Sequence, residues 1–473
     1  MKTCLRCFEY LYVFVGGDVR CCPWNRVVVG NLIDNTLEEI WHGLKMEEIR
    51  AAFMKGELLG CDEEYCPGCI NYNDSLKLSE ENKTKPRISL SEAPVRWISK
   101  EEMQQAYDSM GNVPLNISLA YDKRCNHACP SCRNGIYTPD EQYKCNLKQI
   151  TRNIAPYLNS VKSITTNGIG ELFVSHEILD MLSKLKPERD DFSIFTETNG
   201  VLFKDNWDKL KHLSPYHFTV SVTPNSFHRE TYRYLAGKDN LGKFEESMAF
   251  ISELKQKGDI NHIRMIMVIQ DSNFRQIPEF IQQCIDYDAN DIVLRPIFKW
   301  FGLQENEWLY KNILNPCHPY HREYLEILEN PICKDKRVYN WGFAEKQEPE
   351  SFPTMEMKRW FLSSASKLGE RLNNLLPFFE KHDNLIIYGA GQYGEKCLVE
   401  LLNSIVKDKI SCVAVTHEDG NKKVLCGIPV SGVDKLLGSR EKSAVLIATM
   451  PDAAREIHCT LETRGFKHIV ELF

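Results

Sequence analysis

Three cysteines, Cys125, Cys129 and Cys132, stand close together in the stretch "CNHACPSC". Thiolates bind zinc and iron–sulfur clusters, and a closed site of either kind uses four protein ligands. A local set of three leaves one position open, and His127, between the first two cysteines, is poorly placed to fill it. The spacing therefore favours an iron–sulfur cluster with one iron open to a small molecule. A zinc site with a distant fourth ligand and a set of inert thiols are the alternatives.

A second group of cysteines lies near the start of the chain, where seven of the 18 cysteines precede residue 70. Because no secretion signal is recognisable, dense Cys-x2-Cys spacing indicates metal binding rather than disulfides. We predict a second metal site with these candidate ligands: Cys7, Cys22, Cys66 and Cys69, then Cys61 as a strong competitor, Cys21 as a weaker one, and Cys4, paired with Cys7 near the terminus, set aside. A sequence-local zinc ribbon is the alternative. The scattered remaining cysteines are expected to be small buried hydrophobes.

The elements that would position these cysteines can be read from periodicity. The stretch "YLYVFVGGDVRCCPW" predicts a hairpin, and "NTLEEIWHGLKMEEIRAAFMKG" predicts an amphipathic helix capped by Asn35 or Thr36. We expect residues 1–72 to form a small cysteine-rich α+β domain, followed by a polar linker over residues 73–112.

Residues 113–345 are expected to form the main α/β domain. Six strand-like stretches alternate with helical patterns: "PLNISLAYD", "VKSITTNG", "FSIFTETNG", "HFTVSVTP", "HIRMIMVIQ" and "DIVLRPIF". Such alternation predicts a parallel sheet, either open or curled into a partial barrel. The three-cysteine motif directly follows the first strand, and the carboxyl ends of strands are where these folds place their chemistry.

The end of the chain contains a glycine motif in "NLIIYGAGQYGEKCLVELLN", with Gly389, Gly391 and Gly394 between a strand and a helix. Glycines there permit a tight turn and the approach of a phosphate to the helix N-terminus. After a linker or helical segment at 346–380, we therefore predict a Rossmann-like domain at 381–473, with Glu418 or Asp419 as the ribose-binding candidate. A docking domain that keeps the turn without a ligand is the alternative.

Composition narrows the class of protein. The 473 residues are 43% hydrophobic and 26% charged, with a net charge of −7, which is typical of a soluble globular protein. This charge argues against a broad surface for nucleic acid or anionic membrane. No stretch approaches the roughly 18 apolar residues of a membrane span, and the short apolar N-terminal run lacks a signal-peptide cleavage site. We expect a cytoplasmic protein.

From residue 113 to about 300, the order of motifs resembles the radical S-adenosylmethionine (SAM) enzymes. "CNHACPSC" resembles their cluster loop. "NGIGELFVS" is similar to the segment whose backbone receives the amino group of SAM, which implies that role for Gly168, Gly170 and Glu171, although Leu172 replaces the usual proline. "TETNG" resembles the end of the third strand and implies a SAM-site role for Asn199, and "VSVTPNSFHRETYRYLAGKD" places Ser221 to reach SAM.

Two departures affect the resemblance. Leu235, Ala236 and Gly237 occupy a turn where Arg-Gly is usual, and Ser131 is polar where many members have an aromatic residue near the adenine. The resemblance implies a partial (β/α)6 TIM-type barrel with a 4Fe–4S cluster, SAM on its open iron, and an electron donor such as flavodoxin or ferredoxin. One electron then splits SAM, and the resulting 5′-deoxyadenosyl radical abstracts a substrate hydrogen.

The N-terminal unit resembles a SPASM-type domain, including its helix in "GNLIDNTLEEIWHGLKMEEIR", and this implies a second, auxiliary 4Fe–4S cluster. In most family members this module follows the barrel, whereas here it precedes it. The C-terminal stretches "VLCGIPVSGVDKLL" and "SAVLIATMPDAAREI" resemble small Rossmann modules of bacterial surface-polysaccharide enzymes, which implies NAD(P) or a nucleotide-sugar as ligand.

Three functional hypotheses follow. The first is a radical SAM enzyme of oxidoreductase or epimerase type that acts on a sugar or surface-polysaccharide precursor. The second is the same machinery acting on a peptide, because SPASM domains commonly accompany peptide maturation. The third is a metal-stabilised binding or redox protein without SAM chemistry. An iron-to-protein ratio near eight would favour the first two, because two 4Fe–4S clusters hold eight irons.

Overall fold

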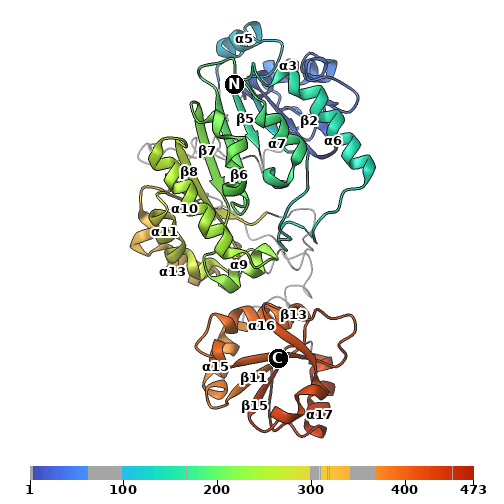
Figure 1. Cartoon of the computed structure of the whole chain (residues 1–473), viewed down its shortest axis with the longest axis vertical. Helices are drawn as coiled ribbons and strands as arrows, with labels where there is room; N and C mark the ends of the chain where they lie inside the picture. The colour runs from blue at the N-terminus through green and yellow to red at the C-terminus, as the bar shows by residue number, and fades with distance from the viewer. Residues whose placement is uncertain are drawn as a thin grey trace.

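A computed structural model gives the structure of the chain and describes residues 4–61, 66, 98–133, 135–166, 168–298, 308, 311–316, 318, 320–340, 368–449 and 451–472. The described residues up to 340 surround a large sheet, and residues 368–472 surround a smaller one (Figure 1). Both parts are mixed α/β, as the sequence predicts. Among the helices described, none combines the length and the apolar character that crossing a bilayer requires.

The large sheet has ten strands in the order β10-β9-β8-β7-β6-β5-β4-β1-β2-β3. Their bounds are β1 (Tyr10–Val13), β2 (Asp18–Arg20), β3 (Gly30–Asn31), β4 (Asn116–Leu119), β5 (Ser163–Thr166), β6 (Ser193–Thr198), β7 (His217–Val222), β8 (His262–Ile269), β9 (Asp291–Pro296) and β10 (Val338–Asn340). Neighbours from β10 to β1 are parallel, and β2 and β3 join as antiparallel strands. The predicted strands correspond to β4 through β9, and all of them are confirmed.

Helices connect the parallel strands and cover one face of the sheet. In the first part of the chain they are α1 (Arg6–Glu9), α2 (Leu37–Trp41), α3 (Leu44–Met54), α5 (Lys100–Asp108), α6 (Glu141–Ile154), α7 (His176–Ser183), α8 (Phe203–Asn206), α9 (Arg229–Ala236), α10 (Leu241–Lys257), α11 (Ile277–Asp286) and α13 (His321–Leu328). The single helix predicted after the hairpin is two helices, because the chain breaks at Gly43, the N-cap of α3. Thr36 caps α2, as one of the two predicted candidates.

The end of the expected linker is helical, which the sequence did not predict. Helix α5 begins with a capping box formed by Ser99 and Glu102, and Met103 is its one buried residue. Because the exposed positions are polar, the segment has no visible apolar stripe. The indole of Trp41 in α2 donates a hydrogen bond to the Gly111 carbonyl at 3.0 Å, which fixes the chain just after α5. Residues 73–97 of the expected linker lie outside the described residues.

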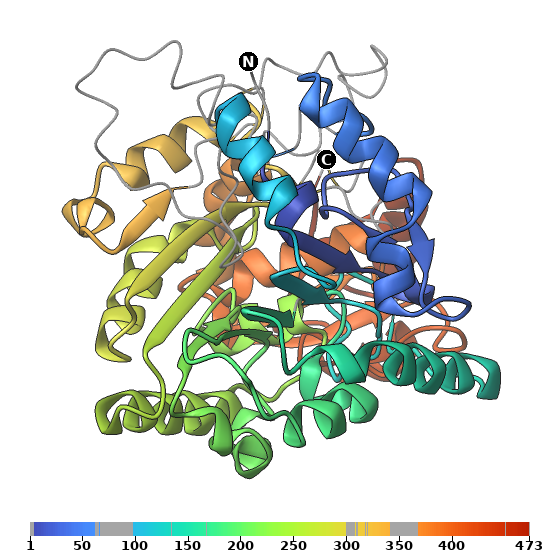
Figure 2. The same cartoon turned by 90° about the horizontal axis from the view of Figure 1, so that it is seen from above.

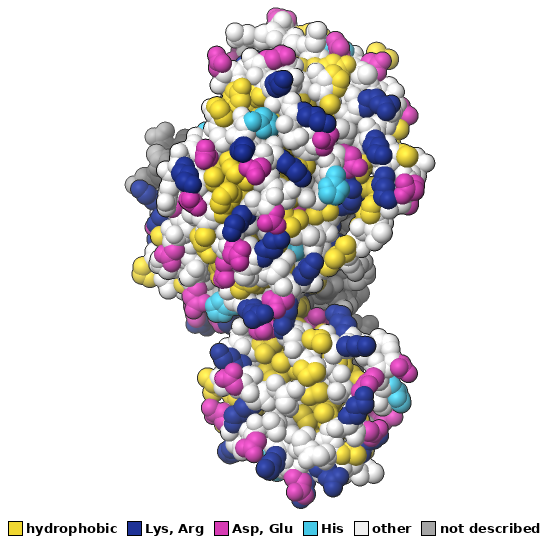
Figure 3. Space-filling model, viewed as in Figure 1, with side chains coloured by type: hydrophobic (Ala, Val, Ile, Leu, Met, Phe, Trp, Pro, Cys, Tyr) yellow, Lys and Arg dark blue, Asp and Glu magenta, His cyan; other side chains and the backbone are white. Residues whose placement is uncertain are grey.

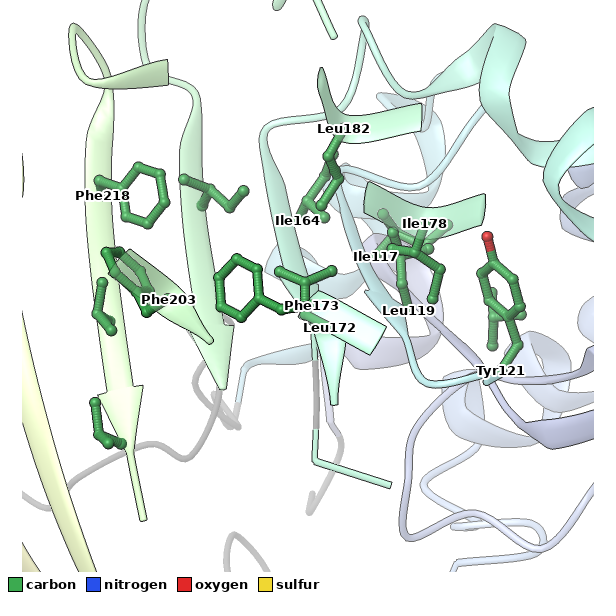
Figure 4. Close-up of a cluster of buried hydrophobic side chains, with 14 of the residues drawn as sticks. Ile117, Leu119, Tyr121, Ile164, Leu172, Phe173, Ile178, Leu182, Phe203 and Phe218 are labelled. Carbon is green, nitrogen blue, oxygen red and sulfur yellow. The ribbon is translucent and has the colours of Figure 1, made fainter. Parts of the chain in front are cut away.

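The core lies between the sheet and its helices. Strand side chains alternate between faces, so every second residue contacts the helices. Figure 4 shows this layer, with Ile117, Leu119, Ile164 and Phe218 from strands packed against Leu172, Phe173, Ile178, Leu182 and Phe203. Full burial of a Leu, Ile or Phe side chain contributes about 1.5–3 kcal/mol, so this layer is what holds the strand ends in place. The opposite face carries polar residues, among them Ser221 and Glu197.

Among the described residues, the strands of the N-terminal unit belong to the large sheet. Its hairpin is present as predicted, but β1 pairs in parallel with β4, with Tyr10 opposite Asn116 and Val13 opposite Leu119. Figure 2 shows this unit in dark blue at one edge of the large sheet, with β10 at the opposite edge. The unit therefore extends the main sheet past its first predicted strand.

The smaller sheet has the order β13-β14-β12-β11-β15-β16. Its elements are α15 (Leu368–Glu380), β11 (Asn384–Tyr388), α16 (Gln392–Leu402), β12 (Ile410–Val415), β13 (Val424–Leu425), β14 (Ile428–Gly432), β15 (Ser443–Ile447), α17 (Pro451–Thr463) and β16 (His468–Glu471). All neighbours are parallel except β13 and β14. Helix α16 contacts the larger part, where Arg275 forms an ion pair with Glu400 at 3.2 Å.

Candidate functional site

The three-cysteine loop begins just after β4, at the carboxyl end of the parallel strands, as the sequence predicts. Cys125, Cys129 and Cys132 are all partly buried, and the Cys132 N–H donates to the Cys129 carbonyl at 2.9 Å. Burial raises the pKa of Cys125 to about 11 and that of Cys129 to about 12, and neighbouring thiols add to the effect. A metal that binds Cys125 and Cys129 would therefore have to displace their protons.

Within the described ranges, no three His, Cys, Asp or Glu side chains converge closely enough to hold a single metal ion. A cubane cluster asks for a wider arrangement, because each thiolate binds a different iron. His127 does not join the thiols. Its ring bonds to the Asn240 side chain at 3.1 Å and packs edge-on against Tyr232, and burial lowers its pKa to about 4.

The cluster loop is held by the turn after α9, where the expected Arg-Gly pair is absent. The Ala128 N–H donates to the Ala236 carbonyl at 3.0 Å. Gly237 has a φ of +66°, and a Cβ there would lie 2.5 Å from the Ala128 carbonyl oxygen. The glycine of this turn is thus required by the close approach of two backbones, whereas the residue before it contributes only its carbonyl.

The Gly168–Glu171 loop follows β5 and lies against the cluster loop. The Glu171 N–H donates to the Arg124 carbonyl at 2.8 Å, and a Cβ on Gly170 would lie 2.3 Å from the Asp122 carbonyl oxygen. Gly168 has more room, because the nearest atom to a Cβ there is the Glu197 carboxylate at 3.4 Å. The two glycines that the resemblance groups together therefore have different structural roles.

Glu171 is buried and clamps this loop to the end of β6. Its carboxylate accepts hydrogen bonds from the Asn199 N–H at 2.8 Å, the Thr198 hydroxyl at 2.8 Å and the Phe173 N–H at 3.3 Å. Burial raises the pKa of Glu171, and these three hydrogen bonds oppose the rise. Its side chain is fully engaged with protein groups, so only the backbone of this loop is available to a ligand.

Asn199 directly follows β6, and Ser221 lies in β7. The Asn199 side-chain amide donates to the Asn126 side chain at 2.7 Å and lies 3.9 Å from the Cys125 sulfur. The Ser221 hydroxyl is fully buried and has no hydrogen-bond partner in the described part of the chain. It lies on the face of β7 opposite to the core residues Val220 and Val222. An unsatisfied buried hydroxyl of this kind fits a bound polar ligand.

Two charged residues near this site were not predicted from the sequence. The Glu197 carboxylate, on the inner face of β6, accepts a hydrogen bond from the Gly168 N–H at 2.9 Å. The Arg133 guanidinium donates to the Lys123 carbonyl at 2.8 Å, to the Ile169 carbonyl at 2.5 Å, and to the Cys132 sulfur at 3.6 Å. Glu197 lies inside the "TETNG" motif and Arg133 directly follows the last cysteine of the loop. A charged residue within or next to a motif could therefore have indicated both from the sequence.

The N-terminal thiols surround one enclosed cavity. Its lining residues are Cys4, Arg6, Cys21, Cys22, Trp24, Phe53, Leu58, Cys61 and Cys66. Of the candidate ligands, Cys22, Cys61 and Cys66 line it, together with Cys21, the weaker candidate, and Cys4, which was set aside. Cys7 is not among the lining residues. Cys69 lies outside the described residues.

Cys7 does not line the cavity itself, but its buried thiol lies close enough to Cys21 and Cys4 for both to raise its pKa. Arg6 faces the cavity, and the Cys7 carbonyl accepts a hydrogen bond from Arg50 of α3 at 3.1 Å. The Cys7 thiol is fully buried in the apolar core, and burial raises its pKa well above the ordinary value. Burial also raises the pKa of Cys4 to about 12. Burial raises the pKa of Cys22 as well, and the nearby Arg6 guanidinium opposes this rise. As at the first site, a metal that binds Cys4 and Cys22 would have to displace their protons.

Two of the three glycines in the C-terminal turn are required by the backbone around them. Gly389 has a φ of +123°, and a Cβ on Gly394 would lie 1.6 Å from the Gly389 carbonyl oxygen. By contrast, a Cβ on Gly391 would meet no atom within 4 Å. Glu418, one of the two ribose candidates, accepts hydrogen bonds from the Gly432 N–H and from Lys435, each at 2.7 Å. Packing within the protein therefore explains why glycine is needed at positions 389 and 394, but it does not explain the glycine at position 391, where the space is open.

Comparison with known families identifies two regions. Residues 122–284 match the radical SAM superfamily, and residues 4–70 match the SPASM iron–sulfur cluster-binding domain. The chain thus contains a radical SAM region, with a SPASM region ahead of it. Both resemblances drawn from the sequence are thereby confirmed. A search of curated proteins finds no match.

Solved structures with a related fold are distant. Streptococcus suis SuiB bound to the precursor peptide SuiA is 14% identical with a TM-score of 0.35, and the match covers 72% of each chain. SuiB bound to S-adenosylmethionine is 14% identical with a TM-score of 0.33, covering 62% of this chain and 66% of that one. The protein anSMEcpe with bound AdoMet is 15% identical with a TM-score of 0.33, covering 48% of this chain and 60% of that one. Likeness at this level carries no argument about substrate.

Proposed function

We propose that this protein reductively cleaves SAM at a 4Fe–4S cluster held by Cys125, Cys129 and Cys132, and abstracts a hydrogen atom from its substrate. The observation that supports this best is the close contact between the cluster loop and the Gly168–Glu171 loop, made through Gly170 and the Glu171 N–H. When bound, the cluster and SAM supply the electron transfer and the radical chemistry.

The residues of the chain then bind, orient and shield. The three thiols, in one loop at the strand ends, would hold the cluster, and Asn199 fixes that loop through Asn126. Glu171 holds the neighbouring loop in place, so its backbone groups are fixed before a ligand arrives. The unsatisfied hydroxyl of Ser221 is the side chain that we assign to SAM.

For the fold, we propose that the large sheet is the partial barrel of the radical SAM core and that the small sheet is Rossmann-like. Counting its parallel strands along the chain, the small sheet runs 3-2-1-4-5, from β14 through β11 to β16. This is the order of the doubly wound dinucleotide-binding fold, with the ligand site where the order reverses. The open Gly391 supports a nucleotide there, and NAD(P) or a nucleotide-sugar remains our candidate.

At the N-terminus, we propose an auxiliary 4Fe–4S cluster in the thiol-lined cavity. The SPASM match and the convergence of Cys4, Cys21, Cys22, Cys61 and Cys66 on one cavity support it. Cys7, whose thiol lies near Cys21, Cys4 and Cys61, stays a candidate ligand. With oxygen-sensitive clusters and many free thiols, we assign the protein to the reducing cytoplasm, with a flavodoxin or ferredoxin as electron donor.

For the substrate, we propose a peptide. The SPASM match supports this class, because such domains commonly accompany peptide maturation. The sugar hypothesis depends on the C-terminal sheet alone, and the comparisons add nothing to it. A peptide encoded beside the gene, deuterated at its side chains, should transfer deuterium into 5′-deoxyadenosine. Transfer from a deuterated nucleotide-sugar instead would return the sugar to first place.

The experiment that tests the core assignment uses anaerobically reconstituted full-length protein. We expect Cys129→Ala to abolish dithionite-dependent formation of 5′-deoxyadenosine, whereas Cys333→Ala, a partly buried thiol outside both sites, leaves it unchanged. The triple variant lacking Cys125, Cys129 and Cys132 should retain roughly four irons in the auxiliary site. Normal SAM cleavage by Cys129→Ala would sink the assignment, and zinc in the auxiliary site would make that unit a ribbon.

A further inference from the structure

Each of the two thiol sites contains one guanidinium group that donates a hydrogen bond to a cysteine sulfur. At the N-terminal cavity, the Arg6 Nη1 atom lies 3.3 Å from the Cys22 Sγ atom. At the core loop, the Arg133 Nη2 atom lies 3.6 Å from the Cys132 Sγ atom. The two arginines come from unrelated positions in the chain, one in α1 and the other in the loop after β4. The same contact therefore arises twice in different local structures.

Arg6 is held in place by burial and by its neighbours. It is 7% exposed, lines the thiol cavity, and its Cζ atom lies 4.9 Å from the centre of the Tyr10 ring. The groups that raise its pKa are Cys22, Tyr10 and Cys4, against the lowering effect of burial. A charge buried this deeply is weakly screened, so its effect on the nearby sulfurs is strong.

Arg133 is held by its own hydrogen bonds. Two backbone carbonyls, Lys123 on one side and Ile169 on the other, accept from its guanidinium, so the group bridges the cluster loop and the Gly168–Glu171 loop. Its charge acts on Cys132, Cys125 and Cys129 together. A planar guanidinium with several donors in a fixed fork suits this bridging role better than an ammonium would.

We propose that Arg6 and Arg133 are positioning residues that raise the reduction potentials of the auxiliary and core clusters. Reduction adds one electron from a flavodoxin-type donor or dithionite, and part of the added negative charge falls on the cysteine sulfurs. A fixed positive donor stabilises that reduced state more than the oxidised one, and hydrogen bonds to sulfur are an established means of tuning cluster potentials. This inference depends on the proposed function, because it assumes a cluster at each site.

The test is a redox titration of the full-length reconstituted protein, followed by electron paramagnetic resonance. Signals are assigned with two variants: Cys129→Ala removes the core signal, and Cys22→Ala identifies the auxiliary one. Arg133→Gln should lower the core potential and leave the auxiliary potential unchanged, and Arg6→Gln should do the reverse. We expect about a tenfold fall in the reduced-to-oxidised ratio at a fixed potential, which is about 59 mV for a one-electron couple. Each variant thus serves as the matched control for the other.

Arg6→Lys and Arg133→Lys keep the charge and should retain more of the wild-type ratio than the Gln variants. Where a Gln variant binds too little iron to titrate, the Lys variant is used for the test. If that Lys variant has full iron content at the site but a reduced-to-oxidised ratio tenfold below wild type, the inference that the positive charge raises the potential is overturned. Unchanged ratios in both Gln variants, with both clusters present, also overturn the inference. If wild-type protein binds no cluster at all, the proposed function fails instead, so the two failures are distinguishable.

Discussion

Gly170 and Gly168 belong to one motif, yet the structure predicts opposite outcomes for an added methyl group. At Gly170 a Cβ would lie 2.3 Å from the Asp122 carbonyl oxygen and 2.6 Å from the Arg124 carbonyl oxygen. Both are backbone atoms at the start of the cluster loop, so neither can rotate away. At Gly168 the nearest atom is the Glu197 carboxylate at 3.4 Å, which is an ordinary contact with a flexible side chain.

The magnitude follows from the overlap. Non-bonded heavy atoms prefer separations of about 3.5–4.0 Å, so Gly170→Ala must push the two loops apart by about 1 Å. Overpacking of this kind costs about 1–3 kcal/mol, and each kcal/mol lowers the melting temperature of a domain of this size by about 2–4 °C. A misplacement of about 1 Å at a reacting centre costs on the order of 100-fold in rate. Because the separation falls between the cluster loop and the loop assigned to SAM, the rate effect should be the larger one.

The assay is dithionite-dependent formation of 5′-deoxyadenosine, measured with iron content and melting temperature for both variants. Gly170→Ala should retain its cluster iron, lose a few degrees of stability, and cleave SAM on the order of 100-fold more slowly. Gly168→Ala should remain within about threefold of wild type, as expected for a change that meets only ordinary contacts. Equal rates for the two variants would refute the argument from loop contact, as would a loss confined to Gly168→Ala.

Three further outcomes are expected. Burial raises the pKa of Glu400 to about 7, so the stability that its protonated form contributes is present below the ordinary pKa of 4.5 and is lost as the pH rises through 7. At 1.36 kcal/mol per pKa unit this contribution is on the order of 3 kcal/mol. Between pH 5 and 8, the melting temperature of Glu400→Gln should therefore change less with pH than that of the wild-type protein. Glu171→Gln replaces one acceptor oxygen with a donor facing N–H and O–H groups, so we expect a loss of about 1–3 kcal/mol in urea unfolding, and unchanged unfolding would contradict the clamp. Gly394→Ala should destabilise the C-terminal sheet whereas Gly391→Ala should not, because only a Cβ at position 394 overlaps the Gly389 carbonyl oxygen. In the same turn, Gly391→Val should abolish any rise in melting temperature that a nucleotide produces in the full-length protein.

The parallel strands could be predicted because their signal is local. Stretches such as "HIRMIMVIQ" are short apolar runs rich in β-branched residues, as expected for strands buried on both faces. The cluster loop could be predicted for the same reason, since its ligands lie within eight positions. Helix α5 escaped prediction because a single buried residue, Met103, gives no periodicity to detect.

The auxiliary site shows where sequence spacing stops being informative. Seven cysteines precede residue 70, and spacing alone ranks Cys7 above Cys4. Which thiols line the cavity depends on how α1 packs against α3, where Arg50 donates a hydrogen bond to the Cys7 carbonyl across 43 positions of sequence. Spacing along the chain does not reveal such packing. The contact of Arg6 with Cys22, 16 positions away, was missed for the same reason.

The position of the SPASM domain before the core has a structural consequence. A parallel pair such as β1 and β4 needs a long crossover, which the residues between them supply. Because β1 continues the large sheet, its side chains divide as in any strand: Leu11 and Val13 enter the main core, while Tyr10 and Tyr12 pack on the other face with Ala120 and Ile169.

Ile169 belongs to the loop assigned to SAM, and the Tyr10 ring stacks under Arg6, which contacts Cys22. One arginine and one tyrosine thus connect the thiol cavity to the polar face of the sheet. The parallel pairing of β1 with β4 therefore places the cysteine-lined cavity of the N-terminal unit next to the polar face of the sheet.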